Sequence, residues 1–301
     1  MIKQTIYALG FFDGVHKGHQ ALLTACRHLA KRTGCAPGAV TFATHPGALV
    51  AGKAPGLINS VQDRRQLLCG YGMEKIQVLP FDEDLMKRPW RAFLEDLLEQ
   101  GAAGFVCGDD FRFGFRGEGN AQLLADFCRE KELFWAVVPG QELDGTRISS
   151  THIRSLLSQG AMEQAVRFLG HPHLLTGKVV PGRHLGRTIG VPTANLTLPE
   201  EVICPRHGVY ACKAIVDGRE YLAVTNIGTR PTVEGHHITV EPWLLDFEGD
   251  LYDKIITLEF HTFLRPEQKF DSLEELRAEI QNNAAQTRKI LEKTLYNSEN
   301  L

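Results

Sequence analysis

The chain has 301 residues, of which 43% are hydrophobic and 23% are charged, and its formal net charge at pH 7 is -3. These values are ordinary for a globular protein, and the length favours about two domains. Acidic and basic residues are interspersed, and no apolar run is long enough to cross a bilayer. The composition therefore argues against a membrane protein and against a nucleic-acid partner.

The seven cysteines are scattered, and none of them forms a C-x-x-C pair. Such an irregular set predicts neither a disulfide framework nor a cysteine zinc site. The N-terminal residues lead directly into a strand-like run and lack the apolar core and cleavage site of a signal peptide. We therefore expect a cytoplasmic protein.

The first half of the chain alternates short apolar runs with amphipathic stretches. Strands are expected at 5–9, 38–42, 75–79, 104–107 and 133–138. Helices are expected at 16–31, 61–70, 90–100, 120–130, 150–159 and 162–169. Strands that alternate with helices of this length predict an α/β domain with a parallel sheet covered on both faces.

The pattern changes after Gly170-His171-Pro172. Strands are expected at 176–180, 209–216, 221–225, 237–247 and 254–263, separated by turn residues such as Asp217-Gly218. This spacing favours a small antiparallel β-barrel, and a sandwich is the alternative. A helix over 272–295 is expected to follow, with a capping box formed by Ser272 and Glu275. The predicted domains are therefore 1–170 and 171–301.

A glycine-rich segment follows the first expected strand, Gly10-Phe11-Phe12-Asp13-Gly14-Val15-His16-Lys17-Gly18-His19. Its glycines allow a sharp turn and a close approach of the backbone to a ligand. His16 and His19 share one face at the start of a helix, where free N–H groups and the helix dipole favour phosphate. The pair could instead be part of a metal site, or a helix cap with ordinary surface histidines.

Two later segments carry similar chemistry. Cys107-Gly108-Asp109-Asp110-Phe111-Arg112-Phe113-Gly114 follows an expected strand, and open α/β sheets bind ligands at such strand ends. Ile148-Ser149-Ser150-Thr151-His152-Ile153-Arg154 opens a helix with hydroxyls and an arginine that suit phosphates.

Together, these three segments resemble the nucleotidyltransferase module of prokaryotic bifunctional riboflavin kinase/FMN adenylyltransferases, the FAD synthetases. The patterns G-x-F-D-G-x-H-x-G-H, G-x-D-F-R-F-G and I-S-S-T-x-I-R occur in order. Phe42-Ala43-Thr44-His45-Pro46 is similar to the family's F-x-P-H-P stretch, with Thr44 in place of a proline. The resemblance implies a Rossmann-like domain in which the FMN phosphate attacks the α-phosphorus of ATP, with Mg²⁺ bridging the phosphates.

The same resemblance implies site residues for this half. His16 and His19 would be catalytic and would hold the ATP phosphates. Further ATP or phosphate contacts would come from Gly10, Phe12, Asp13, Gly14, Gly18, Ser150, Thr151 and Arg154. Flavin contacts would come from Asp109, Asp110 and Phe111.

The second half contains no G-x-x-x-x-G-K-[ST] motif, which excludes a Walker-type kinase. Residues 177–190 instead place glycines around basic residues, and Pro192-Thr193-Ala194-Asn195 follows them. Thr193 and Asn195 are two apart on an extended segment, so both can present neutral oxygens to Mg²⁺. A hairpin turn with a capping asparagine is the alternative.

This stretch is similar to the riboflavin kinase signature G-x-V-x-x-G-x-x-x-G-R-x-x-G-x-P-T-A-N. The resemblance implies a small barrel of the riboflavin kinase type that makes FMN from riboflavin and ATP. Glu241 would accept the proton of the riboflavin 5′-hydroxyl, although by itself it could be a solvent-facing strand residue. The resemblance also implies Thr193 and Asn195 as metal ligands, Arg265 as a flavin contact, and phosphate contacts from Gly182, Gly186 and Arg187.

Three positions depart from the family pattern. Val233 stands where an aromatic residue is usual, and Asn282-Asn283 stand where a carboxylate is common. Pro242 directly follows the proposed base, where a central strand would lose a ladder donor. These departures leave two alternatives to the two-step enzyme: a chain with one activity retained, or a flavin-binding regulator without turnover. The expected ligands are riboflavin, FMN, FAD and ATP, and the sequence leaves the oligomeric state open.

Overall fold

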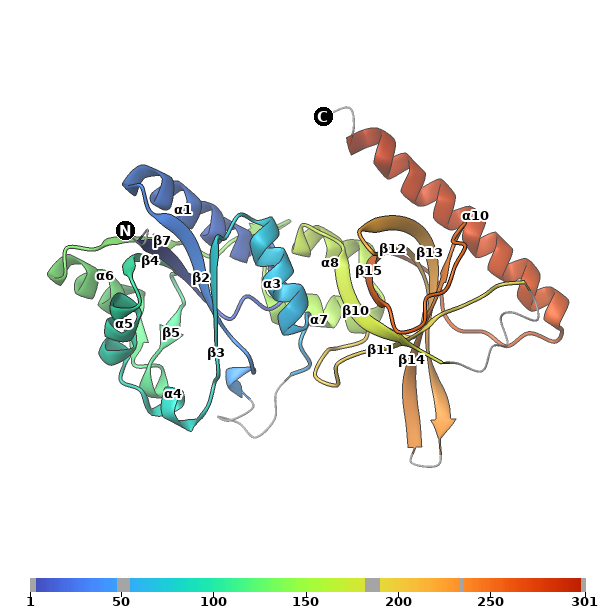
Figure 1. The fold of residues 1–301 in the computed structure, drawn as a ribbon, viewed down its shortest axis with the longest axis horizontal. Coiled ribbons are helices and arrows are strands. Elements are labelled where there is room, and N and C mark those ends of the chain that lie inside the picture. Colours follow the sequence, from blue (N-terminus) through green and yellow to red (C-terminus); the bar gives the residue numbers. More distant parts are fainter. Residues whose placement is uncertain (1–3, 48–54, 182–189, 233–234, 299–301) are drawn as a thin grey trace. The chain divides into compact units, whose positions relative to one another are not determined.

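The computed structural model describes residues 4–47, 55–181, 190–232 and 235–298, and within these ranges it leaves the side chains of 230–232, 235–237 and 293–298 undescribed. The chain divides into two compact units, Met1–Ser150 and Thr151–Leu301. Each unit is described by itself below (Figure 1). The domain boundary expected after residue 170 stays a prediction.

The first unit is built on a five-stranded parallel sheet with the order β3-β2-β1-β4-β7. Its strands are β1 (Thr5–Leu9), β2 (Ala36–Phe42), β3 (Lys75–Leu79), β4 (Ala102–Gly108) and β7 (Phe134–Val138). Side chains alternate along β1, so Ile6 and Ala8 join one core cluster while Tyr7 and Leu9 join the other. The sheet is therefore buried on both faces, and the expected α/β architecture is confirmed.

Two helical layers supply the other halves of these cores, as Figure 1 shows. On one face lie α1 (Lys17–Thr33) and α3 (Val61–Gly70), which contribute Leu23 and Leu68. On the other face lie α5 (Trp90–Glu99) and α6 (Ala121–Glu130), which contribute Leu94 and Leu124. Each of these buried leucines stabilises the fold by about 2 kcal/mol through removal of apolar surface from water.

Several short elements that the sequence did not predict follow the C-terminal ends of β3, β4 and β7. They are α4 (Glu83–Lys87), β5 (Arg112–Phe113), the 3-10 turn η1 (Phe115–Gly117), β6 (Gly119–Asn120), β8 (Glu142–Leu143) and β9 (Thr146–Arg147). Ligands of open α/β sheets bind beyond these strand ends, so the short elements lie where a site is expected.

The second unit is a closed antiparallel barrel with the strand order β10-β11-β14-β13-β12-β15. Its strands are β10 (His173–Val180), β11 (Asn195–Thr197), β12 (Gly208–Val216), β13 (Arg219–Thr232), β14 (Gly235–Leu244) and β15 (Ile255–Arg265). The expected barrel is confirmed and the sandwich alternative is wrong. Asp217 and Gly218 join β12 to β13 with φ values of 49° and 76°, as a type I′ Asp-Gly turn requires.

Pro242 lies within β14 and does not interrupt it. It stands opposite Thr225 of β13, and its carbonyl accepts the N–H of Ala194 at 2.9 Å. The N–H and C=O of a strand residue point to the same side, so the donor that proline lacks would face Ala194 rather than β13. The ladder between β13 and β14 therefore stays intact next to Glu241.

The helices described in this part of the chain are α7 (Ser150–Gln159), α8 (Met162–Leu169) and α10 (Leu273–Ser298). The last of them packs against β12 and β13, where Ala284 meets Val209 and Val224. At its start Ser272 Oγ accepts the N–H of Glu275 at 3.1 Å, which is the first half of the expected capping box. The Glu275 carboxylate reaches back to the N–H of Asp271, one residue earlier than in the standard motif.

Candidate functional site

His16 and His19 are held together at the first turn of α1. His16 is the N-cap residue, and its Nδ1 accepts the N–H of His19 at 3.3 Å. Because Nδ1 accepts, the proton of the neutral ring lies on Nε2. The two rings stack with centroids 3.6 Å apart and an interplanar angle of 11°. A Cβ at Gly18 would lie 3.2 Å from the His16 ring, so the glycine keeps this arrangement open.

The environment keeps His19 uncharged at neutral pH. Burial lowers its pKa well below the usual value, and the nearby His16 and Arg64 lower it further. Its Nδ1 is buried and has no hydrogen-bond partner among the described residues. His16 is only 6% exposed. Thus His16 does cap the helix, but neither ring is an ordinary surface histidine.

Asp13 and Ser150 shape the loop that precedes the two histidines. Asp13 Oδ1 accepts the N–H groups of Ile58 and Asn59 at 2.9 and 3.3 Å. Ser150 Oγ donates to the carbonyl of Asp13 at 2.9 Å. Gly14 has a φ of 80°, in the left-handed region that glycine adopts freely. These contacts fix the backbone that carries His16.

A cavity of about 230 Å³, here called the histidine cavity, lies at this helix start. Of the residues predicted from the sequence, it is lined by Gly10, His16, Gly18, His19, Asp109, Asp110, Phe111 and Ser150. Asp13 and Gly14 are not among its lining residues, and the Phe12 side chain is buried in the core. Thr151 and Arg154 follow on α7 in the second unit, and their contact with ATP stays a prediction.

The two aspartates in the wall of this cavity have different partners. Asp109 Oδ2 accepts the N–H of Gly140 at 3.2 Å, and Asp110 forms an ion pair with Arg147 at 2.5 Å. Arg147 also lines the cavity. It directly precedes the Ile148-Ser149 motif, and sequence reasoning missed it because a single arginine beside a motif is not a distinctive signal.

A second, larger cavity of about 680 Å³ is here called the aromatic cavity. It is lined mainly by apolar and aromatic side chains, among them Phe42, Pro46, Phe81, Leu85, Met86, Phe93, Phe113 and Phe115. The rings of Phe111 and Phe113 stack with centroids 5.3 Å apart, and they line the histidine and aromatic cavities respectively. One stacked pair therefore contributes a ring to the lining of each cavity.

Arg64 lies fully buried beside both cavities and was also missed from the sequence. Its Nη1 donates to the carbonyls of Phe11 and Phe42 at 3.2 and 2.8 Å and to Thr41 Oγ1 at 3.0 Å. The guanidinium carbon lies 4.3 Å from the centre of the Phe11 ring. Burial lowers the pKa of Arg64, and the charge of Asp13 opposes that effect. This residue ties the end of β2 to the loop after β1.

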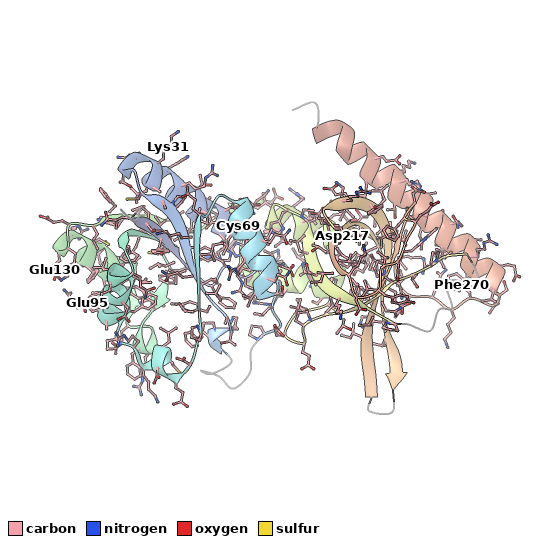
Figure 2. The ribbon with its side chains drawn as sticks, in the orientation of Figure 1. Lys31, Cys69, Glu95, Glu130, Asp217 and Phe270 are labelled. Carbon is pink, nitrogen blue, oxygen red and sulfur yellow. The ribbon has the colours of Figure 1, made fainter. Side chains whose placement is uncertain are left out.

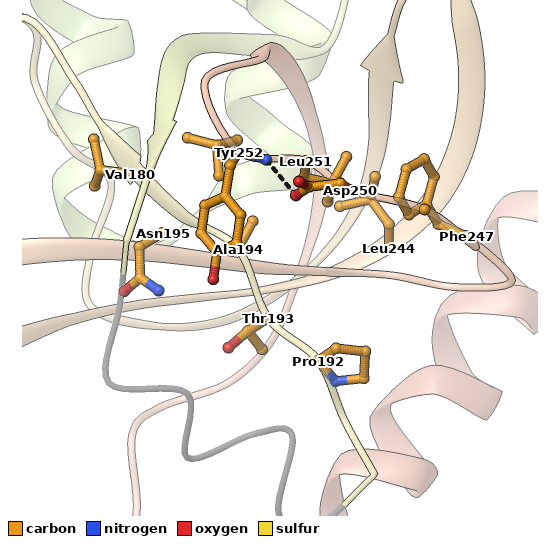
Figure 3. Close-up of a pocket in the computed structure, with 12 residues that line it drawn as sticks. Val180, Pro192, Thr193, Ala194, Asn195, Leu244, Phe247, Asp250, Leu251 and Tyr252 are labelled. Atoms are coloured by element: carbon orange, nitrogen blue, oxygen red, sulfur yellow. Dashed lines mark hydrogen bonds between the residues drawn. The ribbon is translucent and has the colours of Figure 1, made fainter.

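In the barrel, a cavity of about 80 Å³, here called the Tyr252 cavity, brings Thr193 and Asn195 together with the loop before β15. Figure 3 shows the two side chains on one segment with the Tyr252 ring close by. The Tyr252 N–H donates to Asp250 Oδ1 at 2.9 Å. Asn195 opens β11 and pairs with Val180, so it is a strand residue and not the cap of a hairpin turn.

A separate cavity of about 480 Å³, here called the Glu241 cavity, lies between the barrel and α10. Glu241 is half-buried and stands opposite Asn226 in the ladder, and both residues line the cavity. The apolar part of the lining comes mainly from Val191, Val209, Val224, Trp243, Phe270, Leu273, Leu276 and Ile280. Thr193 lines this cavity as well as the Tyr252 cavity.

Of the other residues predicted in the barrel, the structure describes some and not others. Arg265 lines the Glu241 cavity, and its contact with a flavin stays a prediction. Glu267, which the sequence did not single out, lines the same cavity. A Cβ at Gly228 would lie 2.3 Å from Glu267 Oε1, so that carboxylate rests directly on the glycine. The proposed phosphate contacts Gly182, Gly186 and Arg187, and the departure at Val233, lie outside the described residues.

No group of three or more His, Cys, Asp or Glu residues that could hold a metal occurs in the described part of the chain. Within these residues, the His16 and His19 pair is not joined by the further ligands that a zinc site needs. Among the same residues, no helix is both long enough and apolar enough to cross a membrane.

The chain was compared with protein-family models, curated proteins and solved structures. The riboflavin kinase model matches residues 169–291, and the FAD synthetase model matches residues 1–152. A bifunctional riboflavin kinase/FMN adenylyltransferase of Listeria monocytogenes is 32% identical over 94% of this chain and 91% of its own length. The protein of that name from Escherichia coli K12 is 37% identical, over 91% of this chain and 89% of its own.

A crystal structure of a macrolide-efflux protein from Streptococcus pneumoniae also aligns with this fold. The TM-score is 0.85 and the identity is 28%, over 96% of this chain and 95% of that one. The two family models together cover most of the sequence, and the curated relatives extend over both halves. The chain therefore belongs to the bifunctional riboflavin kinase/FMN adenylyltransferase family.

Proposed function

We propose that the two reactions of this family take place in separate units, phosphorylation of riboflavin in the barrel and adenylylation of FMN in the α/β unit. The family membership makes the chain both a riboflavin kinase and an FMN adenylyltransferase. One observation carries the assignment of sites. Each unit has a smaller cavity lined by polar groups that can bind phosphate, and a larger cavity that is mainly apolar. This pair of cavities suits ATP and a flavin.

In the barrel, riboflavin occupies the Glu241 cavity and ATP the Tyr252 cavity. Glu241 accepts the proton of the 5′-hydroxyl as that oxygen forms a bond to the γ-phosphorus, and the bond to the β-phosphate oxygen breaks to release ADP. Thr193 borders both cavities, which supports a transfer across its position. The rings of Tyr252 and Phe247 give the adenine an aromatic surface.

The donors at the Tyr252 cavity fit Mg²⁺. The Thr193 hydroxyl and the Asn195 carbonyl are neutral oxygen ligands, and they suit an ion that keeps several waters and ATP phosphates in its shell. Bound there, the ion supplies positive charge against the phosphates. No all-protein cage of acidic residues is needed.

In the α/β unit, ATP occupies the histidine cavity and the flavin ring the aromatic cavity. A phosphate oxygen of FMN attacks the α-phosphorus, the bond between the α-phosphorus and the bridging oxygen breaks, and pyrophosphate leaves. Neutral His16 and His19 can donate hydrogen bonds to the phosphate oxygens at the positive end of the α1 dipole. The stacked Phe111 and Phe113 join the two subsites.

Two substitutions test the separation of sites in the full-length protein. Glu241→Gln keeps the side-chain shape but removes the base, so we expect FMN formation to fall by about 100-fold or more. The same variant should convert supplied FMN to FAD normally. His19→Ala should have the opposite pattern. Riboflavin, FMN and FAD are separated by chromatography after incubation with ATP and Mg²⁺.

The matched control is Glu220→Gln, which changes an exposed carboxylate on β13 that pairs with Lys213. It should leave both rates unchanged. Equal loss of both reactions in Glu241→Gln or in His19→Ala would contradict two separate sites.

We also propose a cytoplasmic location and a protein that acts without nucleic acid. The seven cysteines are free, and most of them are buried in the two cores, which suits a reducing compartment. Fractionation of cells that express the protein would test the location.

A further inference from the structure

The departure at Asn283 is accompanied by a carboxylate one helical turn earlier on α10. Glu279 and Asn283 are four residues apart and therefore share one face of the helix. Asn283 is 1% exposed, and its Nδ2 donates to Glu279 Oε1 at 2.8 Å. The two side chains thus form one unit at the edge of the Glu241 cavity, which Asn283 lines.

Both side chains hold the same atom of Arg265. Its Nε donates to Asn283 Oδ1 at 3.1 Å and lies 3.1 Å from Glu279 Oε1. Its Nη1 donates to the carbonyl of Pro266 at 3.1 Å. The guanidinium carbon lies 5.6 Å from the centre of the Phe270 ring, which Figure 2 labels near the start of α10.

These contacts leave one nitrogen of Arg265 for a ligand. Nη2 makes no hydrogen bond to any residue in the described part of the chain, whereas Nε and Nη1 are both engaged. The Arg265 side chain is 17% exposed and lines the cavity that also contains Glu241. A guanidinium fixed at two nitrogens presents the third in a defined direction.

The charge balance at this point depends on Glu279. Burial lowers the pKa of Arg265, and the charge and hydrogen bond of Glu279 act in the opposite direction. Asn283 can orient the guanidinium but carries no charge. Within the described residues, the ion pair of Arg265 is with Glu279.

We infer that Glu279 is the positioning residue for Arg265 in the riboflavin kinase reaction, and that Asn283 links the two side chains. This inference rests on the proposed contact between Arg265 and the flavin. It explains the missing carboxylate at 282–283, because the negative charge has moved one turn along the same helix face. Glu279 then supplies the negative charge beside Arg265 that Asn283 lacks.

The test compares Glu279→Gln with the double variant Glu279→Gln/Asn283→Asp in the full-length protein. Glu279→Gln keeps an acceptor oxygen but removes the charge that strengthens its contact with Arg265, a contact worth one to two factors of ten in binding, so the KM for riboflavin should rise by about tenfold. We expect kcat to change by less than about threefold, because Glu279 does not touch the reacting atoms. The double variant returns a carboxylate to this face and should recover most of the riboflavin KM.

Two controls separate positioning from folding. Glu274→Gln removes an exposed carboxylate in the first turn of α10 and should leave the riboflavin KM unchanged. The FMN adenylyltransferase rate of each variant should equal that of the wild type. A merely structural role would lower the Tm and would not be relieved by Asp at position 283.

Arg265→Ala distinguishes the flavin contact of Arg265 from the positioning of Arg265 by Glu279. If it raises the riboflavin KM while Glu279→Gln does not, the inference fails and the flavin contact of Arg265 stands. If Arg265→Ala leaves the KM unchanged, the proposed flavin contact fails, and the inference fails with it. Failure of the double variant to recover the KM would also overturn the inference.

Discussion

At the residue scale, the chain buries uncharged histidines in both units. His173 begins β10 and has no exposed surface, and neither of its ring nitrogens has a partner among the described residues. Its ring lies 5.9 Å from that of Phe260. Burial lowers the pKa of His173 to about 3, and His171 contributes in the same direction. The native barrel therefore contains the neutral ring.

This histidine should make the protein less stable in acid. The folded-state pKa lies below the unfolded value of about 6.5, so below that pH the unfolded chain binds a proton that the folded chain does not. Stability should fall as pH drops from about 6.5 towards 3, and this residue alone should contribute a loss of about 2 kcal/mol at pH 5. His173→Phe, which cannot titrate, should show a smaller drop in Tm between pH 7.5 and pH 5.

The control for this experiment is His28→Gln, which removes an exposed histidine from α1. Its Tm should depend on pH as that of the wild type does. If the Tm of His173→Phe depends on pH as that of the wild type does, His173 does not contribute to the loss of stability in acid.

At the element scale, the short β5–η1 segment depends on two glycines with different constraints. Gly114 has a φ of 74°, and a Cβ there would lie 2.4 Å from the Cα of Trp90 at the start of α5. Gly117 has a φ of 67°, but a Cβ there would lie 3.5 Å from the Cβ of Arg112. Alanine would therefore have a strained backbone at both positions, but only at position 114 would its Cβ clash with the backbone of Trp90.

We expect Gly114→Ala to damage the aromatic cavity more than Gly117→Ala. Left-handed strain costs about 1 kcal/mol in either variant, and overpacking adds about 1–3 kcal/mol for Gly114→Ala. The KM for FMN in the adenylyltransferase reaction should rise by about two- to tenfold in Gly114→Ala and by less in Gly117→Ala, if half of the added cost reaches the cavity. The riboflavin kinase rate measures whether the barrel is unaffected, and equal KM changes would contradict this account.

The sequence predicted the long elements well, because their apolar periodicity is carried by consecutive residues. Helices α3, α7 and α8 begin and end where the pattern places them. The short elements were missed because two or three residues carry no period. The aromatic cavity was missed for another reason, since its residues come from separate segments and meet only in the folded chain.

Arg64 could have been recognised in the sequence from its position on α3. On α3 it lies three and four residues before Leu67 and Leu68, which pack in the apolar core. A cation on an apolar face must find partners inside the protein, so the position itself indicated a buried polar network. By contrast, the motif residues His16, His19 and Glu241 were singled out from the sequence resemblance, and the structure shows that each of them lines a cavity.

At the scale of the whole molecule, each unit has its own apolar core. Phe105 belongs to the core of the α/β unit, and Phe260 is buried inside the barrel, where its ring meets that of Tyr210. Units with separate cores can unfold separately. The two activities should then be lost at different temperatures.

Core truncation tests this expectation. Phe260→Ala should destabilise the barrel by about 3–5 kcal/mol and lower the temperature at which riboflavin kinase activity is lost. The temperature for loss of adenylyltransferase activity should stay the same. Phe105→Ala should have the reverse effect, and joint loss of both activities in either variant would show that the units unfold together. Thermal inactivation is followed with the two assays on one sample.

The position of Thr193 on the wall of two cavities has a thermodynamic consequence. A side chain cannot adjust to a molecule on one side without changing the surface offered to the molecule on the other. If riboflavin alters the nucleotide dissociation constant by some factor, the nucleotide must alter that of riboflavin by the same factor. In the kinase half, any such coupling belongs to the pair of substrates, and a measurement of either affinity with and without the other substrate gives its size.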